Sequence, residues 1–246
     1  MPLTVQSKNA EEGLALEELA YRRLREALGG GAFLPGDRLS IRRVADALGM
    51  SSMPARTALR RLAAEQALDL LPNGTAVVPR LTRPAFIELS AIRAELEPLA
   101  LRLAAPHLDG AALDGLAAIV AGHDEARLRG DSDAVRRLDR DFLFTIYRAA
   151  QAPLLLNLIE TLWLRRGPIF WELRWAALAA GGMRHAHGEI LLALRGGQIA
   201  AASAALRQEI TDASLFIQGA MRFADDDAPK DRLAALKRPQ ARALGG

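Results

Sequence analysis

The chain has 246 residues, of which 50% are hydrophobic, a formal net charge of +3 and no cysteine. This length allows two domains with their own cores, and the lack of cysteine excludes disulfides and thiolate metal sites and fits a reducing cytoplasm. The apolar runs are too short to cross a membrane and no secretion signal is recognisable, so we expect a cytoplasmic protein without a membrane partner.

The N-terminal region is expected to begin with a short flexible segment followed by a helix. Residues 1–13 are polar and predict a flexible N-terminus. Between residues 14 and 28 the apolar residues recur at helical spacing, and the glycines at 29–31 end this amphipathic helix. A first domain is expected over residues 14–80.

Two short helical patterns, separated by a tight turn, lie between residues 41 and 64. Gly49 ends the first pattern, because glycine is the usual residue after a helix. Ser51 or Ser52 can cap the second helix, and Pro54 lies in its first turn, where a missing backbone N–H costs little. The spacing therefore predicts a helix-turn-helix.

A β-hairpin is predicted directly after the second helix. The segments 68–71 and 75–78 are apolar and flank Pro72-Asn73-Gly74, and an Asn-Gly pair between such segments is a strong hairpin signal. Helix, turn, helix and hairpin together predict a winged helix-turn-helix.

The helix pair is strongly basic, since residues 38–61 contain six arginines and one acidic residue, Asp46. A basic stripe alone is usually a solvated face. On a winged helix-turn-helix, however, arginines and hydroxyls beside a helix N-terminus suit the phosphate-lined groove of double-stranded DNA. We therefore expect DNA contacts from Arg42, Ser51, Ser52, Met53, Arg56, Arg60, Asn73 and Gly74.

Residues 24–78 resemble the DNA-binding domain of the GntR family of bacterial regulators. The segments LREAL, PGDRLS, VADALGMSS and PARTALRRLAAE occur in the family's order before a short wing. The resemblance implies that Arg42 contacts DNA, that Arg56 reads bases, and that the wing tip Asn73-Gly74 approaches the minor groove. Ser52 stands where the family usually has arginine, so the base preference should be shifted while binding is kept.

Residues 84–224 are expected to form an all-α domain. Leucine, isoleucine and alanine recur at three- and four-residue spacing, and no segment has the alternation of a strand. Proline and glycine pairs break the pattern into six or seven helices. The charged residues 225–246 predict a disordered tail. The expected fold is therefore mainly α: a small α+β winged domain followed by a helical bundle.

The helical region resembles the ligand domain of the FadR-like branch of the same family, the FCD type. IRAELEPLALRLAA, FLFTIYRAAQAPLLLNLIETLW and HGEILLALRGG match it in order and spacing. Many members hold a divalent metal through one aspartate and three histidines. The resemblance implies that Asp139, His187 and Glu209 occupy three ligand positions, whereas Leu143 replaces the histidine expected four residues after Asp139.

Two interpretations of this altered site remain open. Asp139, His187 and Glu209 could hold a divalent metal ion, with water completing the shell. They could instead form a polar cluster that hydrogen-bonds an effector directly, which the loss of an imidazole ligand favours. His185 is expected at the surface, because it would lie on a different helical face from His187.

Two arginines are further candidates for binding an acidic effector. Arg93 needs an anionic partner inside a helical domain, and Glu97 on the next turn could supply it internally. Arg148 is the second candidate, so the expected effector-binding residues are Arg93, Asp139, Arg148, His187 and Glu209. Three aromatic candidates for a cavity wall are Trp163, Trp171 and Trp175.

The sequence thus predicts a transcription regulator that acts as a repressor, binds a palindromic operator as a homodimer and responds to a small organic acid. The alternative is an enzyme in which Asp139, His187 and Glu209 bind a metal or metabolite and activate water. Asp139 and Asp141 are only two residues apart on a helix and form no acid–base pair. Nucleophile-elbow, phosphate-loop and zinc-protease motifs are absent from the sequence.

Overall fold

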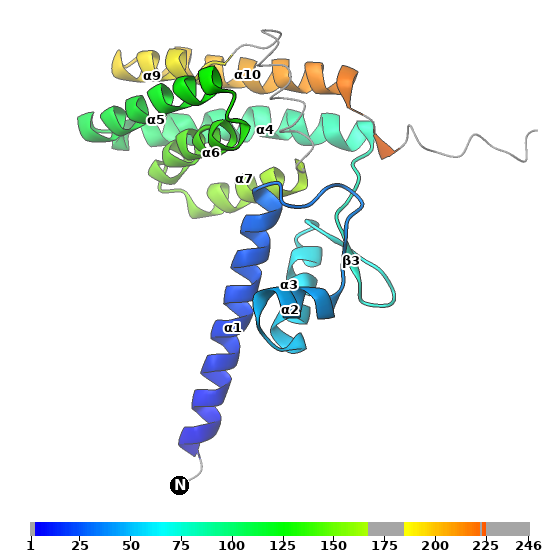
Figure 1. Cartoon of the computed structure of the whole chain (residues 1–246). Coiled ribbons are helices and arrows are strands. Elements are labelled where there is room, and N and C mark those ends of the chain that lie inside the picture. Colours follow the sequence, from blue (N-terminus) through cyan, green and yellow to red (C-terminus); the bar gives the residue numbers. More distant parts are fainter. Residues whose placement is uncertain (1–2, 167–184, 222, 225–246) are drawn as a thin grey trace, which may run out of the picture.

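The computed structural model describes residues 3–166, 185–221 and 223–224, and the side chains from residue 13 onward. A small winged domain, supported by one long helix, lies beside a layered group of helices (Figure 1). The mainly α fold with a small three-stranded sheet confirms the expected fold class. Within these ranges no helix is long and apolar enough to span a membrane.

The first helix, α1, runs from Leu3 to Gly29 and therefore begins earlier than the start at Leu14 that the sequence predicted. Residues 3–12 contain few apolar residues and so show no helical periodicity, yet Gln6, Lys8, Ala10, Glu11 and Glu12 are good helix formers. Toward its C-terminus α1 buries one apolar stripe against α3, which includes Ala20, Leu24 and Leu28. This stripe anchors the winged domain.

The helix-turn-helix consists of α2 (Ile41–Leu48) and α3 (Ser52–Ala64). The Ser40 side chain accepts a hydrogen bond from the Arg43 N–H at 3.3 Å and caps α2. Gly49 ends α2 with a φ of 65°, which confirms the predicted stop. Ser51 is the N-cap residue of α3 but makes no side-chain capping bond, so its hydroxyl is not held by that helix end.

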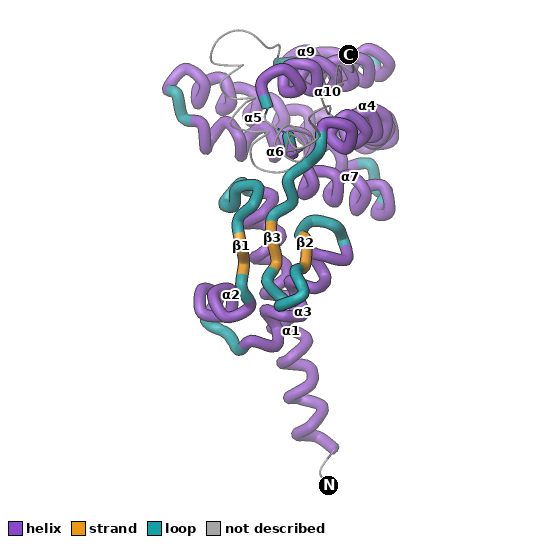
Figure 2. Tube along the Cα trace, turned by 90° about the vertical axis from the view of Figure 1, so that its right-hand side faces the viewer, coloured by secondary structure: helices purple, strands orange, loops and turns teal. Residues whose placement is uncertain are grey.

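The sheet has three strands where the sequence predicted a two-stranded hairpin. It consists of β1 (Arg38–Leu39), β2 (Asp69–Leu70) and β3 (Ala76–Val77), in the order β1-β3-β2 with antiparallel pairing (Figure 2). β1 was missed because two residues are too short to show alternation. Gly74 has a φ of 79°, which the turn between β2 and β3 requires.

The helical domain begins after a short connection at Thr82, whose hydroxyl caps α4 by accepting from the Ala85 N–H. Its described helices are α4 (Arg83–Ala104), the short η1 (Ala105–His107), α5 (Gly110–Arg129), α6 (Ser132–Ala149), α7 (Pro153–Arg166), α9 (His187–Arg195) and α10 (Ile199–Ala220). Asp109 and Asp131 cap α5 and α6 through their side chains.

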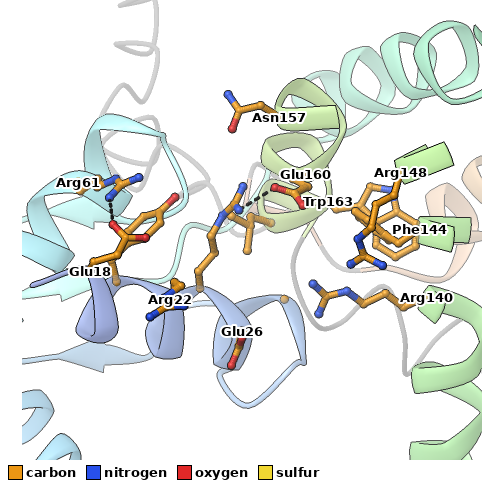
Figure 3. Close-up of a pocket in the computed structure, with 14 residues that line it drawn as sticks. Glu18, Arg22, Glu26, Arg61, Arg140, Phe144, Arg148, Asn157, Glu160 and Trp163 are labelled. Carbon is orange, nitrogen blue, oxygen red and sulfur yellow. Dashed lines mark hydrogen bonds and ion pairs between the residues drawn. The ribbon is translucent and has the colours of Figure 1, made fainter. Parts of the chain in front are cut away.

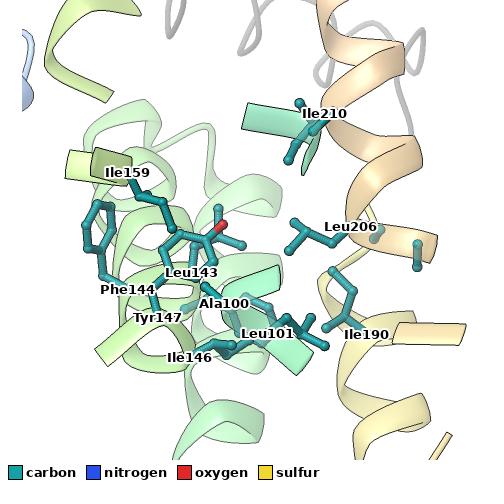
Figure 4. Close-up of a cluster of buried hydrophobic side chains, with 14 of the residues drawn as sticks. Ala100, Leu101, Leu143, Phe144, Ile146, Tyr147, Ile159, Ile190, Leu206 and Ile210 are labelled. Atoms are coloured by element: carbon teal, nitrogen blue, oxygen red, sulfur yellow. The ribbon is translucent and has the colours of Figure 1, made fainter. Parts of the chain in front are cut away.

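The core of the helical domain lies where α4 and α6 meet α7, α9 and α10 (Figure 4). Leu101 of α4, Ile146 of α6, Ile190 of α9 and Leu206 of α10 are all almost completely buried. α10 packs along α4, and α5 packs against α6 and α9. Trp171, Trp175 and the charged residues 225–246 lie outside the described residues.

Candidate DNA-binding face and buried histidine cluster

The exposed face of α3 and the wing border one hollow. Arg56 and Arg60 are exposed on α3, and they line a depression of about 250 Å³ together with residues of the wing, including Gly74. The two elements that a winged helix-turn-helix uses on DNA therefore flank the same space.

The remaining expected DNA contacts also lie at this face or beside it. Ser51, Ser52 and Met53 form the exposed N-terminal end of α3. On α2, Arg42 is 3.9 Å from Asp46, but both side chains are largely exposed, so this pair leaves Arg42 available to phosphate. Asn73 accepts a hydrogen bond from the Thr75 N–H at 3.0 Å, which stabilises the wing turn. Contact of these residues with DNA stays a prediction.

The second candidate site is a buried cluster in the helical domain. Asp139 comes from α6, His187 is the first residue of α9, and Glu209 comes from α10; all three are almost completely buried. One donor atom from each, together with one from His185, lies within 4.8 Å of the others. His187 Nε2 is 3.5 Å from Asp139 Oδ1. The structure thus brings together the three residues that the sequence singled out.

His185 belongs to this cluster, so its expected surface position is wrong. The expectation rested on a helix that already included both histidines, but α9 begins at His187. His185 precedes the helix, and a helical-face argument does not apply to it. Its ring centroid lies 4.0 Å from that of His187, and His187 in turn stacks on Phe142 at 4.1 Å.

His123 is a further member that the sequence analysis missed. It lies on α5, is completely buried and stacks on His185 with centroids 3.9 Å apart and rings inclined by 10°. Three of the chain's four histidines therefore gather at one place. The signal was weak, because His123 sits on the inward stripe of α5 with Leu116 and Ala126, where a histidine usually serves the core.

The cluster has a fourth donor although Leu143 cannot bind a metal ion. The Leu143 side chain is buried among core residues such as Ile159 and Tyr147, while His185 supplies the additional imidazole from a different element. Two imidazoles and two carboxylates that converge in a buried site form a donor set that suits a divalent transition metal.

Glu97 organises a buried polar network next to this cluster. It accepts hydrogen bonds from Arg93 Nε at 2.6 Å, from Tyr147 Oη at 2.5 Å and from Trp163 Nε1 at 2.9 Å. Burial, followed by the negative charge of Glu97, raises the pKa of Tyr147 well above its usual value. Glu97 therefore supplies the internal partner that the sequence allowed for Arg93.

Arg148 lies apart from the buried cluster. Its side chain is exposed on α6, where it faces a cavity next to α1, whereas Asp139 points into the domain. The structure therefore separates Arg148 from the other four residues that were expected to bind an effector.

A winged helix-turn-helix attached to a helical domain with a buried donor cluster is the architecture of a DNA-binding regulator with a sensing domain. Residues 16–78 match the bacterial regulatory proteins of the gntR family, and residues 88–212 match the FCD domain. The chain therefore belongs to the GntR family, within the group that carries an FCD domain. It is a transcription regulator and not an enzyme, because this family consists of regulators.

Individual relatives agree with this assignment. The chain is 34% identical over 168 residues to the HTH-type transcriptional regulator McbR of Escherichia coli K12. The aligned region covers 68% of this chain and 74% of that protein. The structure of E. coli McbR/YncC superposes with a TM-score of 0.75 and 29% identity, over 84% of this chain and 99% of that one. A GntR-type regulator from Rhodococcus sp. RHA1 shares the fold, with a TM-score of 0.66, 24% identity and coverage of 84% and 99%.

Proposed function

We propose that this regulator is a repressor that binds a palindromic operator as a homodimer and responds to a small organic acid in its helical domain. One winged helix-turn-helix covers one half-site, so two-fold symmetry in the protein corresponds to a palindrome in DNA. The exposed arginines Arg56 and Arg60, which border the same hollow as the wing, support contact with the major groove.

The observation that carries the sensing role is the convergence of Asp139, His185, His187 and Glu209. These residues would hold a divalent metal ion. His123 stacks on His185 and would orient the His185 imidazole toward that ion. A bound divalent ion would supply positive charge for an organic carboxylate. A hard carboxylate pair and two imidazoles favour an ion such as zinc, nickel or manganese over magnesium, which prefers oxygen ligands and water.

The donors connect elements from different parts of the helical domain. Asp139 lies on α6, His187 on α9 and Glu209 on α10, so a ligand held there would constrain the spacing of these three helices. A ligand shifts DNA binding only through its difference in affinity for two arrangements of the protein. α6 also packs beside α7, which contacts α1 of the winged domain, and this contact provides a physical route between the sites.

The test begins with protein freed of divalent ions by a chelator and then reloaded with zinc. DNA sites selected from a random pool would supply the operator, and binding would be titrated with and without a panel of small organic acids. We expect the selected DNA sites to be palindromic. At least one acid should lower the affinity of wild type for these sites and leave the affinity of His187→Ala unchanged. DNA binding that is indifferent to zinc and to every acid would argue against the sensing role, while non-palindromic sites would argue against the dimer.

A further inference from the structure

A second candidate ligand site lies between the two domains, away from the buried cluster. A cavity of about 390 Å³ is bordered by α1 and the end of α3 on one side and by α6 and α7 on the other (Figure 3). This volume falls within the range of sites for small molecules. Its polar lining comes mainly from arginine and glutamate side chains, so charge decides which molecule would fit.

Two of the arginines at the cavity are neutralised by neighbouring carboxylates. Arg61 Nη1 lies 2.7 Å from Glu18 Oε2, and Arg25 Nη1 lies 2.7 Å from Glu160 Oε2. Figure 3 draws the contact between Arg61 and Glu18 as a dashed line. The two pairs stabilise the walls and leave little net charge for a ligand.

Three other arginines at the cavity, Arg22, Arg140 and Arg148, make no ion pair within the described part of the chain, and Glu26 is the one remaining carboxylate among the lining residues. The unneutralised charge is therefore positive. A guanidinium recognises carboxylate and phosphate groups through paired hydrogen bonds, so this excess favours an oxyanion.

Phe144 helps to hold two of these arginines at the cavity. Arg140, Phe144 and Arg148 are spaced four residues apart and share one face of α6. The guanidinium carbons of Arg140 and Arg148 lie 5.3 and 5.6 Å from the centre of the Phe144 ring, distances at which a cation and an aromatic ring attract. Both guanidinium groups point into the gap between the domains in Figure 3. Two cations are thereby held side by side.

We propose that this cavity binds a small organic dianion, carrying either two carboxylates or one phosphate group, through Arg140 and Arg148 of α6 and Arg22 of α1. Such a ligand would touch both domains at once, because α1 belongs to the winged domain and α6 to the helical domain. It stabilises the arrangement of the domains in which the three arginines face one cavity, by an amount that grows with ligand concentration.

This site is separate from the buried cluster although both use α6. Asp139 points into the helical domain toward His187, whereas Arg140, the next residue, lines the interdomain cavity. Successive helical residues point in different directions, so one helix serves both sites. Because α6 carries side chains of both sites, a ligand at either one constrains the same helix.

The test is isothermal titration of the chelator-treated full chain with succinate and, separately, with inorganic phosphate. We expect saturable binding of at least one of the two. The double variant Arg140→Gln/Arg148→Gln should bind it at least about tenfold more weakly. Arg129→Gln serves as the control, because it removes one exposed arginine charge on α5. His187→Ala should bind as wild type does, which separates this cavity from the buried cluster.

The outcomes distinguish the two sources of the dianion and the two sites. Binding of succinate alone assigns a dicarboxylate, and binding of phosphate alone assigns a phosphate ester. Arg22→Gln changes an exposed residue on the opposite wall of the cavity. It should weaken the binding of the same probe, so the proposal can be tested even if the double variant does not fold. The proposal is overturned if wild type binds neither probe. It is also overturned if the probe still binds to Arg22→Gln and to the double variant as it does to wild type, or if His187→Ala is the one variant that loses binding.

Discussion

Arg25 of α1 and Glu160 of α7 form an ion pair across the boundary between the winged domain and the helical domain, with Nη1 and Oε2 2.7 Å apart. Both side chains are about three-quarters shielded from solvent, with exposures of 22% and 25%. Beside the pair, Leu164 of α7 packs on the hydrophobic cluster of the winged domain. The domains therefore meet through a specific contact in addition to their covalent connection.

Removing this pair should loosen the domain boundary with little effect on overall stability. We expect Arg25→Gln to cost at most about 1 kcal/mol in the free energy of unfolding, because a partly exposed pair is screened by water. Trypsin should cut faster after Arg80, in the connection between β3 and α4, and mass spectrometry would follow that cut. Glu160→Gln should act alike, whereas Arg23→Gln on the exposed face of α1 should not. Equal cleavage rates in all four proteins would contradict a holding role for the pair.

The second prediction separates base reading from backbone contact. Arg56→Ala should weaken binding to a selected operator by about 1–3 kcal/mol with little effect on random DNA. Arg42→Ala should weaken binding to all sequences and lower the slope of affinity against salt by about one unit. Fluorescence titrations at several salt concentrations would measure both effects. Operator affinity that is unchanged in Arg56→Ala would remove the base-reading role from this residue.

The third prediction concerns the missing arginine at the start of α3. Ser52 is exposed at the first position of this helix, so Ser52→Arg places a cation where the groove is expected. We expect higher affinity for DNA in general and a stronger preference for guanine in selected sites. The matched change Ser132→Arg, at the first turn of α6, adds the same charge outside the winged domain. The same affinity and the same sites for Ser52→Arg and wild type would mean that this residue does not face DNA.

Local signals made the winged domain predictable. Gly49 and Asn73-Gly74 mark a helix end and a turn through backbone conformations that glycine favours, and these depend on neighbouring residues only. β1 escaped because it is defined by pairing with β3, far along the chain, and a strand of two residues has no periodicity. The start of α1 was placed too late because residues 3–12 lack the apolar periodicity that marks an amphipathic helix.

The buried cluster was predictable only in part, for a different reason. Asp139, His187 and Glu209 were predicted from the resemblance of the helical region to the family's ligand domain, whereas His185 depends on where α9 begins and His123 on the rotation of α5. The interdomain cavity was out of reach, because it depends on how α1 lies against α6 and α7. Sequence periodicity describes one helix at a time and contains no information on that placement.

The last prediction tests whether the histidine cluster holds a metal ion. We expect about one divalent ion per chain by elemental analysis after reloading with zinc, and a lower melting temperature after treatment with a chelator, since an ion that binds the folded state alone stabilises it. His185→Ala should lose the ion although this residue was expected at the surface, because its donor lies within 4.8 Å of those of Asp139, His187 and Glu209.

His123→Ala should weaken metal binding less than His185→Ala does, since His123 stacks on His185 and stands outside this set of four donors. His107→Ala is the matched control: His107 is the remaining histidine and is exposed at the end of η1. If wild type and His185→Ala take up the same amount of zinc and melt alike with and without the chelator, the cluster is not a metal site, and its carboxylates and imidazoles are then left to bind an effector directly.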